Sequence, residues 1–391
     1  MGGGHFSALL AAGRDAASGP GRARIPVTVL TGFLGSGKTT LLNRLLREPD
    51  LHGTAVIVNE FGAIGIDHDL IAQTTEDTVL LANGCMCCAV RGDLVAALAA
   101  LGARDAADGP PLRRVLIETS GLADPAPILR TLMGDPAVTG RFALAGVCCT
   151  VDAVLAPGTL DRHPEAERQV AMADRLLLTK TDLLAGEPVA PALIERVTRL
   201  NPDATLHLPP ADLVDVLRRA MRADADAPAG GEGERGPVYR PLPGAGTDGG
   251  ADEPPMHADG IRSFVIVRDE PLPRDGFESW LDTVIAMRGE DLLRVKGIVN
   301  LAEEPERPLV FHGVQHLYQP PAFLPAWPSA DRRTRIVFIT RAVDAEALDE
   351  SLRVFARRRR VRSAAPAPDP SASTPPTTTP TTTTTTDLET P

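Results

Sequence analysis

The 391-residue chain has no run of about 18 consecutive apolar residues, the length that a helix needs to cross a bilayer. A short apolar piece at residues 6–12 has no basic region before it, so it does not fit a secretory signal. Positive charge is also in deficit, because 40 Lys and Arg stand against 51 Asp and Glu and the net charge is −11. Binding to duplex nucleic acid needs a basic face. We therefore expect a cytoplasmic protein that binds neither a membrane nor nucleic acid.

Cysteine is scarce as well, with five residues in the chain. Cys148 and Cys149 lie in a strand-like apolar run, and we interpret both as buried core residues. Cys85, Cys87 and Cys88, here called the thiol triplet, follow a glycine and precede a predicted helix. A turn of this kind leaves the three thiols free to converge on an ion.

Three clustered thiolates favour soft or borderline metals, with Zn²⁺ the first candidate and Co²⁺, Ni²⁺ or Cu⁺ behind it. A structural zinc site normally has four protein ligands. Three ligands therefore indicate either a distant fourth ligand or an open position from which the metal is passed on. A redox disulfide is the competing interpretation, although an intracellular protein is not expected to keep a structural one.

The segment Thr31–Thr40 reads Thr-Gly-Phe-Leu-Gly-Ser-Gly-Lys-Thr-Thr and matches the phosphate-binding motif G-x-x-x-x-G-K-[ST]. It lies between a predicted strand at Ile25–Leu30 and a predicted amphipathic helix at Thr40–Arg47. Backbone N–H groups of such a loop surround phosphate oxygens, and the helix N-terminus adds partial positive charge. The predicted nucleotide-binding residues here are Gly32, Gly35, Ser36, Gly37, Lys38, Thr39 and Thr40.

Particular roles follow for the side chains of this motif. Lys38 is predicted to reach the β- and γ-phosphates, Thr39 to place its hydroxyl on Mg²⁺, and Thr40 to lie beside the α-phosphate. A predicted apolar strand ends in Glu118, where P-loop enzymes place the acid that holds Mg²⁺ or its water. Gly121 follows at the position that senses the γ-phosphate. We therefore expect Lys38, Thr39 and Glu118 to be catalytic.

A second predicted strand ends in Thr179-Lys180-Thr181-Asp182, the x-K-x-D arrangement that reads guanine. Asp182 would accept hydrogen bonds from N1 and N2 of guanine, and the stem of Lys180 would cover the base. Adenine offers no such pair of donors, so GTP is favoured over ATP. The first position of the motif is commonly Asn, and Thr179 weakens or rearranges one polar contact to the base or to the phosphate loop.

As an ordered set, these motifs resemble the CobW-like family of P-loop GTPases, a metallochaperone group with zinc-delivering and cobalamin-linked members. The resemblance covers about residues 24–358 and rests on Gly35–Thr40, Val58–Gly62, Gly65–Asp67, Gly84–Cys88, Glu118–Pro125 and Thr179–Asp182. It implies that GTP hydrolysis alters a switch segment at Asn59–Asp67, which connects the nucleotide to the thiol triplet. Related proteins often have a second carboxylate where this chain has Ala63, so an accessory metal site there is not supported.

The chain divides into five predicted segments. Alternating strands and helices at 23–222 predict an α/β P-loop GTPase domain with a mostly parallel sheet. Short strands and one or two helices at 261–360 predict a small α+β domain that resembles the C-terminal domain of the same family. We expect a flexible leader at 1–22, a linker or insertion at 223–260, and a disordered Pro/Thr-rich tail at 361–391.

Histidine offers little further support for metal binding. Some relatives have a histidine-rich tract in the linker, where this chain has only His257. His312 and His316 are four positions apart in the sequence, a spacing that shares one face only on a helix. Their segment has the pattern of a strand and turn, which favours structural or partner-facing roles.

The leading hypothesis is a GTP-dependent metallochaperone that binds zinc on the thiol triplet and delivers it to a client metalloprotein. The alternatives are a cobalt-handling GTPase for cobalamin or nitrile hydratase maturation, a metal-independent P-loop NTPase or kinase with redox thiols, and a metal sensor or buffer without turnover. No obvious arginine finger or water-positioning glutamine occurs, so basal turnover should be slow. Related nucleotide-switch proteins often pair across their nucleotide faces, so a nucleotide-dependent homodimer is also an expectation.

Overall fold

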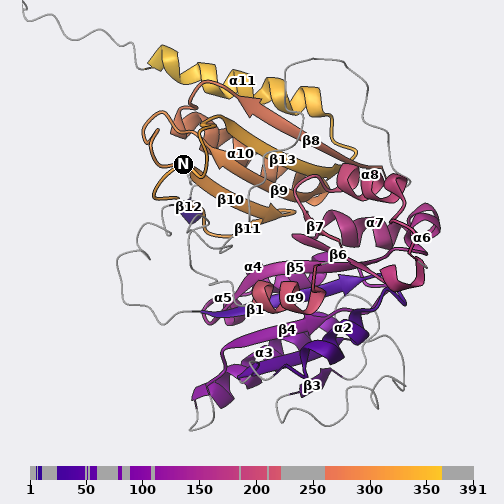
Figure 1. Cartoon of the computed structure of the whole chain (residues 1–391). Coiled ribbons are helices and arrows are strands. Elements are labelled where there is room, and N and C mark those ends of the chain that lie inside the picture. The colour runs from indigo at the N-terminus through magenta and orange to yellow at the C-terminus, as the bar shows by residue number, and fades with distance from the viewer. Residues whose placement is uncertain are drawn as a thin grey trace, which may run out of the picture.

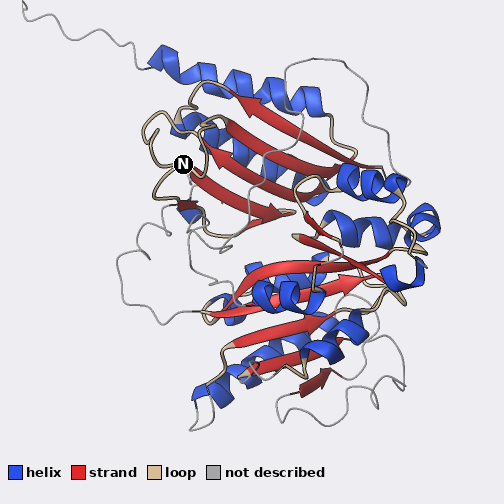
Figure 2. Cartoon of the chain, in the orientation of Figure 1, coloured by secondary structure: helices blue, strands red, loops and turns tan. Residues whose placement is uncertain are grey.

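The computed structural model describes residues 6, 8–10, 24–48, 51, 53–59, 78–81, 89–106, 111–184, 186–208, 211–221 and 260–362. Within these ranges the chain forms two sheets with helices packed on them (Figures 1 and 2). The thiol triplet, residues 60–67 of the switch segment, residues 223–259 of the predicted linker and residues 363–391 of the predicted tail lie outside the described residues.

The first sheet contains seven described strands, all parallel, in the order β3-β2-β4-β1-β5-β6-β7. This confirms the predicted parallel sheet. Its inner strands are nearly continuous apolar runs because both of their faces are covered. The bounds are β1 (Ile25–Gly32), β2 (Thr54–Asn59), β3 (Thr78–Leu81), β4 (Arg114–Glu118), β5 (Phe142–Asp152), β6 (Arg175–Thr179) and β7 (Thr205–His207).

Helices cover the two faces of this sheet and form two separate cores. One core lies between the sheet and α2 and α9, and the other lies between the sheet and α3, α4, α7 and α8. The bounds are α2 (Lys38–Leu45), α3 (Ala89–Ala106), α4 (Ala126–Gly134), α5 (Pro136–Thr139), α6 (Ala156–Arg162), α7 (Pro164–Ala171), the 3-10 helix η3 (Thr181–Leu184), α8 (Pro191–Leu200) and α9 (Leu213–Met221).

Cys148 and Cys149 have the core positions that were predicted for them. They are neighbours on β5, so their side chains point to opposite faces and enter the two different cores. Burial raises the pKa of each thiol to about 12. Both therefore stay protonated at neutral pH. A cysteine that binds a metal or acts as a nucleophile needs to be a thiolate instead.

The second sheet is antiparallel, in the order β11-β10-β9-β13-β8, with β12 paired to β10. Helices α10 and α11 pack on one of its faces, as expected for the α+β domain. The bounds are β8 (Ile261–Arg268), α10 (Arg274–Arg288), the 3-10 helix η4 (Gly289–Asp291), β9 (Leu292–Val299), β10 (Leu309–Val314), β11 (Leu317–Tyr318), β12 (Ala322–Phe323), β13 (Thr334–Arg341) and α11 (Ala345–Arg362).

The opposite face of the second sheet packs on the first domain. Ile261, Leu293, Val314 and Ile339 belong to the same buried apolar cluster as α4, α7 and α8. The side chain of Gln319 also reaches across and donates to the Leu144 carbonyl at 2.9 Å. The two domains therefore share part of one core.

A cluster of buried charges lies at this domain boundary. Arg294 of β9 forms an ion pair with Asp174, and Lys296 pairs with both Asp174 and Asp203. Burial acts to raise the pKa of Asp174, but the charges of Arg294 and Lys296 outweigh it and hold this pKa well below its ordinary value. The Asp174 carboxylate is therefore ionised. Removal of Arg294 or Lys296 should lower the free energy of unfolding by a large amount.

His312 stands next to this cluster, on β10 directly across from Lys296 of β9. Burial, and after it the Arg294 guanidinium, lowers the pKa of His312 from 6.5 to about 3. The imidazole is therefore neutral at physiological pH and is packed between the domains. His316, by contrast, lies exposed in the turn between β10 and β11.

The beginning of the chain departs from the sequence-based expectation. Phe6 and residues 8–10 form a helical turn that packs in the core of the C-terminal domain. Phe6 is fully buried and Leu10 is 4% exposed. The expected flexible leader at 1–22 is therefore wrong for this turn, because burial of two large apolar side chains can offset the entropy lost by a short segment.

We expect His312→Gln to flatten the acid side of the stability profile. Folded His312 stays neutral down to about pH 3, whereas the unfolded chain takes up this proton near pH 6.5. Unfolding therefore binds a proton between these values, and this residue should lower the free energy of unfolding by roughly 1 kcal/mol per pH unit below pH 6.5. Urea unfolding of wild type and variant at neutral and mildly acidic pH measures the difference.

His316→Gln is the matched control, because His316 is exposed in a turn. It should keep the wild-type pH dependence. Equal slopes for wild type and His312→Gln would contradict the assignment of a half-buried imidazole that is neutral in the folded protein.

Candidate functional site

The predicted phosphate loop forms the connection between β1 and α2. Gly32 ends β1 with a φ of 139°, and a Cβ there would lie 2.3 Å from the Thr150 hydroxyl oxygen. Gly37 immediately precedes α2 with a φ of 91°, which side chains other than glycine rarely adopt. Glycine is therefore required at both ends of the loop, which lies at the positive end of α2.

Lys38 and Thr39 begin α2 beside the end of β4. The buried Lys38 donates from Nζ to the carbonyl oxygens of Gly32, at 2.8 Å, and Phe33, at 3.2 Å. The Thr39 hydroxyl donates to Glu118 Oε1 at 2.8 Å. The structure thus brings two predicted catalytic residues into contact and places the third next to them. Hydroxyl and carboxylate oxygens are hard donors of the kind that Mg²⁺ prefers, so this pair fits the predicted ion.

Two threonines join the phosphate loop to the neighbouring strands. Thr150 of β5 pairs in register with Gly32, and its Oγ1 lies 2.6 Å from Ser36 Oγ. Thr179 Oγ1 lies 2.7 Å from the Ser36 carbonyl oxygen and 3.2 Å from that of Val151, to which it can donate. Thr179, at the position where Asn is common, therefore keeps a polar contact to the loop. The sequence analysis did not predict the contact of Thr150 with the phosphate loop. The only sign of it in the sequence is that Thr150 is a polar residue within an apolar strand.

Lys180 is held in position by an acid that the sequence analysis did not select. Its backbone has a φ of 59°, and its Nζ lies 2.8 Å from Asp152 Oδ2. Asp152 also accepts the N–H groups of Val154 and Leu155 at 2.8 and 3.0 Å. Burial acts to raise the pKa of Asp152, but these contacts hold it below its ordinary value. Asp182 lies exposed in η3.

Gly121 lies directly against the phosphate loop. A Cβ at this position would lie 2.6 Å from the Leu34 nitrogen and 2.7 Å from its Cα, so only glycine permits the approach. The buried Gln169 of α7 donates to the carbonyl oxygens of Gly121 and Ala123 at 3.1 and 3.0 Å. Gln169 thus fixes the segment that follows β4. No local motif in the sequence indicates this contact, because α7 is distant in the chain.

The thiol triplet lies between β3 and α3 in the sequence, outside the described residues. β3 ends at Leu81, which pairs in register with Asn59 of β2. On its other side, β2 pairs with β4 through Val58 and Glu118. Among the residues that the structure describes, no group of three or more Cys, His, Asp or Glu could hold a metal ion. None of the described helices is long and apolar enough to cross a membrane.

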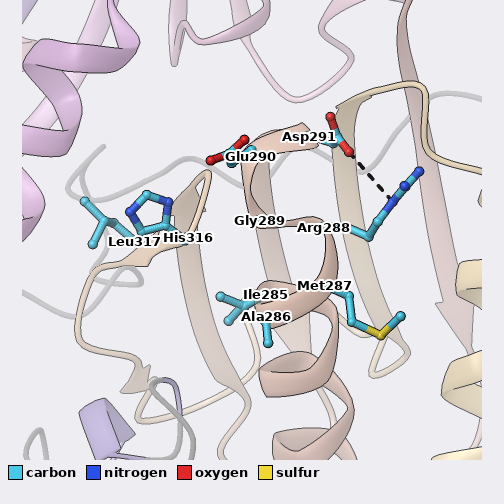
Figure 3. Close-up of a pocket in the computed structure, with 9 residues that line it drawn as sticks. All are labelled: Ile285, Ala286, Met287, Arg288, Gly289, Glu290, Asp291, His316 and Leu317. Carbon is cyan, nitrogen blue, oxygen red and sulfur yellow. Dashed lines mark ion pairs between the residues drawn. The ribbon is translucent and has the colours of Figure 1, made fainter.

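A pocket of about 560 Å³ lies on the C-terminal domain, between the end of α10 and the turn that joins β10 to β11 (Figure 3). Arg288 and Asp291 form an ion pair of 3.8 Å at its rim. None of its lining residues belongs to the phosphate loop or the x-K-x-D segment. They are Ile285, Ala286, Met287, Arg288, Gly289, Glu290, Asp291, His316 and Leu317.

A parallel sheet with a glycine loop between its central strand and the next helix, and a carboxylate in contact with that helix, defines a P-loop nucleotide-binding protein. Residues 26–207 match the model of the CobW/HypB/UreG nucleotide-binding domain, and residues 261–356 match the cobalamin synthesis protein CobW C-terminal domain. The chain belongs to the CobW family of P-loop GTPases.

Individual relatives match along most of their length. The chain is 34% identical to the zinc chaperone YjiA of Escherichia coli over 317 residues, which covers 81% of this chain and 93% of the relative. It is 29% identical to the zinc chaperone CobW of Sinorhizobium sp. over 359 residues, covering 81% and 92%. The crystal structure of Zn(II)-bound YjiA GTPase from E. coli superposes with a TM-score of 0.62 at 28% identity, covering 85% of this chain and 99% of that one.

Thr179→Val should weaken the binding of guanine nucleotides. The substitution keeps the shape of the side chain but removes its hydrogen bond to the Ser36 carbonyl. A lost hydrogen bond costs about 1 kcal/mol, which corresponds to a roughly fivefold higher Kd for GDP. Titration with a fluorescent guanine nucleotide measures this. Thr181→Val, two residues away, should bind like the wild type, and equal affinities for all three proteins would contradict a role for Thr179.

Proposed function

We propose that this protein is a GTP-dependent metallochaperone that binds Zn²⁺ on Cys85, Cys87 and Cys88 and transfers it to client metalloproteins. The observation that carries the proposal is the position of β3. The carboxyl end of this strand lies at the same end of the sheet as Glu118 and the phosphate loop, and the first thiol follows the strand after three residues in the sequence. The zinc chaperones among the relatives support the choice of metal.

The nucleotide site supplies the hydrolytic part of this function. Lys38 is poised at the mouth of the loop, where its Nζ can move from backbone carbonyls to the β- and γ-phosphates of GTP. Thr39 and Glu118 would hold Mg²⁺, which when bound offsets the negative charge that develops on the phosphates. Gly121, in contact with the loop, is placed to sense the γ-phosphate.

Guanine would be read at the ends of β5 and β6. Asp152 holds the Lys180 side chain, so the stem that covers the base is fixed before the nucleotide binds. Asp182 is exposed in η3 and free to accept the N1 and N2 hydrogens of guanine. The preference for GTP over ATP therefore depends on Asp182, with Lys180 and Asp152 supporting it.

Nucleotide and zinc would be coupled through the loops at this edge. A γ-phosphate with Mg²⁺ orders nearby switch loops, and hydrolysis releases them. If bound GTP changes the zinc affinity of the thiol triplet by some factor, zinc must change the GTP affinity by the same factor. Zinc binding displaces thiol protons, so zinc affinity should fall at acid pH. Hydrolysis then gives a direction to the transfer.

Exposed apolar side chains at the carboxyl ends of the parallel strands, where the nucleotide is predicted to bind, support a homodimer that forms across this face. Seven large hydrophobic residues are exposed within the described ranges, and five of them follow β1, β4, β5 or β6 at the nucleotide edge. Exposed apolar side chains that gather at one end of a sheet are typical of an interaction surface. The five are Leu34, Leu122, Val154, Leu155 and Leu183.

Cys87→Ser should weaken zinc binding by at least about a hundredfold, because one of three thiolate ligands is lost. Titration of reduced protein against a competing zinc chelator measures the affinity without nucleotide, with GDP–Mg²⁺ and with a non-hydrolysable GTP analogue. The wild-type affinity should differ between nucleotide states by about 5- to 150-fold. The same titration with Co²⁺ tests the cobalt alternative.

Cys148→Ala is the matched control for this experiment, because it removes a thiol that is fully buried in the core of the first domain. It should keep the wild-type zinc affinity. If a variant with serine at positions 85, 87 and 88 binds zinc as tightly as the wild type, the thiol triplet is not the zinc site. A zinc affinity that is the same in every nucleotide state would separate the metal from the GTPase.

Leu122→Asp combined with Leu155→Asp should abolish the nucleotide-dependent dimer, because two charges would be buried in its apolar interface. We expect the dimer Kd with the GTP analogue to rise by at least about tenfold in analytical ultracentrifugation. Met287→Asp is the control, since Met287 is exposed on the other domain. A wild-type chain that stays monomeric with the analogue would contradict the dimer.

A further inference from the structure

The N-terminal helical turn occupies a socket formed by three rings of the C-terminal domain, Phe277, Phe311 and Tyr318, here called the aromatic socket. The Phe6 ring centroid lies 6.0, 5.4 and 5.8 Å from these rings, at interplanar angles of 90°, 74° and 83°. Edge-to-face geometry of this kind is favourable between aromatic side chains. The Phe6 N–H donates to Asp282 Oδ1 of α10 at 2.7 Å. The turn is therefore held by both an apolar anchor and a polar contact.

Two strand glycines make room for the rings of the socket. Gly297 of β9 is paired with Phe311, and a Cβ at 297 would lie 2.3 Å from that ring. Gly313 of β10 is paired with Tyr318, where a Cβ would lie 2.6 Å from the ring. Glycine weakens a strand interior, and here it lets both rings lie close over the backbone. The C-terminal domain thus shapes the socket with its own residues.

The N-terminal turn lies outside the part of the sequence that matches the C-terminal domain of the family. The residues of the socket lie within 261–356, which match the CobW C-terminal domain, whereas Phe6 precedes both matched regions. Phe311 is 5.7 Å from Phe277 and 6.0 Å from Tyr318 between ring centroids, so the rings also contact one another. The Tyr318 hydroxyl is buried and has no hydrogen-bond partner among the described residues. The Tyr318 hydroxyl is therefore a polar group of the socket that the N-terminal turn leaves without a hydrogen bond.

The occupant has the pattern of a helical recognition peptide. Phe6, Leu9 and Leu10 stand at positions i, i+3 and i+4, which share one face of a helix. Phe6 and Leu10 are buried in the domain core, and Leu9 packs against it. This is the arrangement by which an amphipathic helix inserts its apolar anchors into a groove of another protein.

We propose that the aromatic socket is a docking site for a short helical peptide anchored by a phenylalanine, and that Phe6, Leu9 and Leu10 of this chain are its intramolecular occupant. The covalent tether gives the turn a high effective concentration at the socket. A second peptide with the same anchor must displace the turn in order to bind. This interaction is independent of zinc and GTP, and goes beyond the proposed chaperone function.

The test compares the wild-type chain with a full-length Phe6→Ala, Leu10→Ala variant whose socket is vacated. The probe is a fluorescently labelled synthetic peptide of residues 1–14, and its binding is followed by anisotropy. The peptide should bind the variant at least about tenfold more tightly than the wild type, because the tethered turn competes with it. A peptide with Phe6→Ala should not bind. Equal binding to both proteins, or binding to neither, would overturn the proposal.

Hydrogen exchange on the wild-type chain gives a second measurement that does not depend on how the variant folds. The Phe6 amide should exchange at least about a hundredfold more slowly in the protein than in the free peptide, because it donates to Asp282. Asp282→Ala should reduce this protection. Exchange at the free-peptide rate would contradict docking, and protection that appears only in a dimer would assign the turn to a second copy instead.

Discussion

In a parallel sheet every strand brings its carboxyl end to the same edge, and the nucleotide site of this protein depends on that constraint. β1 leads into the phosphate loop, β4 ends in Glu118, β5 ends in Asp152, and β6 ends in Thr179. Although far apart in the sequence, these residues meet because the register of the buried strands fixes their heights. A shift of one residue in β4 would turn the carboxylate to the other face of the sheet and away from Thr39.

The C-terminal domain completes the first domain rather than simply following it. One face of its sheet carries α10 and α11, and the other contributes apolar residues to the core beneath α4, α7 and α8. Arg294 and Lys296 reach from β9 to Asp174 at this boundary, where exclusion of water strengthens their attraction. Removal of one of these charges would leave one opposite charge of the cluster without full compensation in a buried place, so such a substitution should destabilise the contact between the domains.

Much of the fold and the nucleotide site could be predicted from the sequence, because the phosphate loop, Glu118 and the x-K-x-D segment are local patterns tied to strand ends. The missing parts depend on contacts between distant residues. Phe6 looked like part of a flexible leader because its partner Asp282 is 276 positions away. Gln169 and Asp152 belong to no motif, and their roles follow only from the elements packed beside them. Asp152 did have a usable signal, since it ends an apolar strand as Glu118 does.

The shortness of β6 has a mechanical consequence. The strand has five residues and is about 17 Å long, with the clamped Asp174 just before it and Thr179 at its end. Because β6 is extended and hydrogen-bonded to β5 and β7 on its two sides, a displacement of its beginning is passed on to its end. A tilt of the C-terminal domain would therefore also displace Thr179 and the segment that follows it, which is predicted to read the base. A partner that tilts the C-terminal domain on binding would therefore also change the rate at which the nucleotide dissociates.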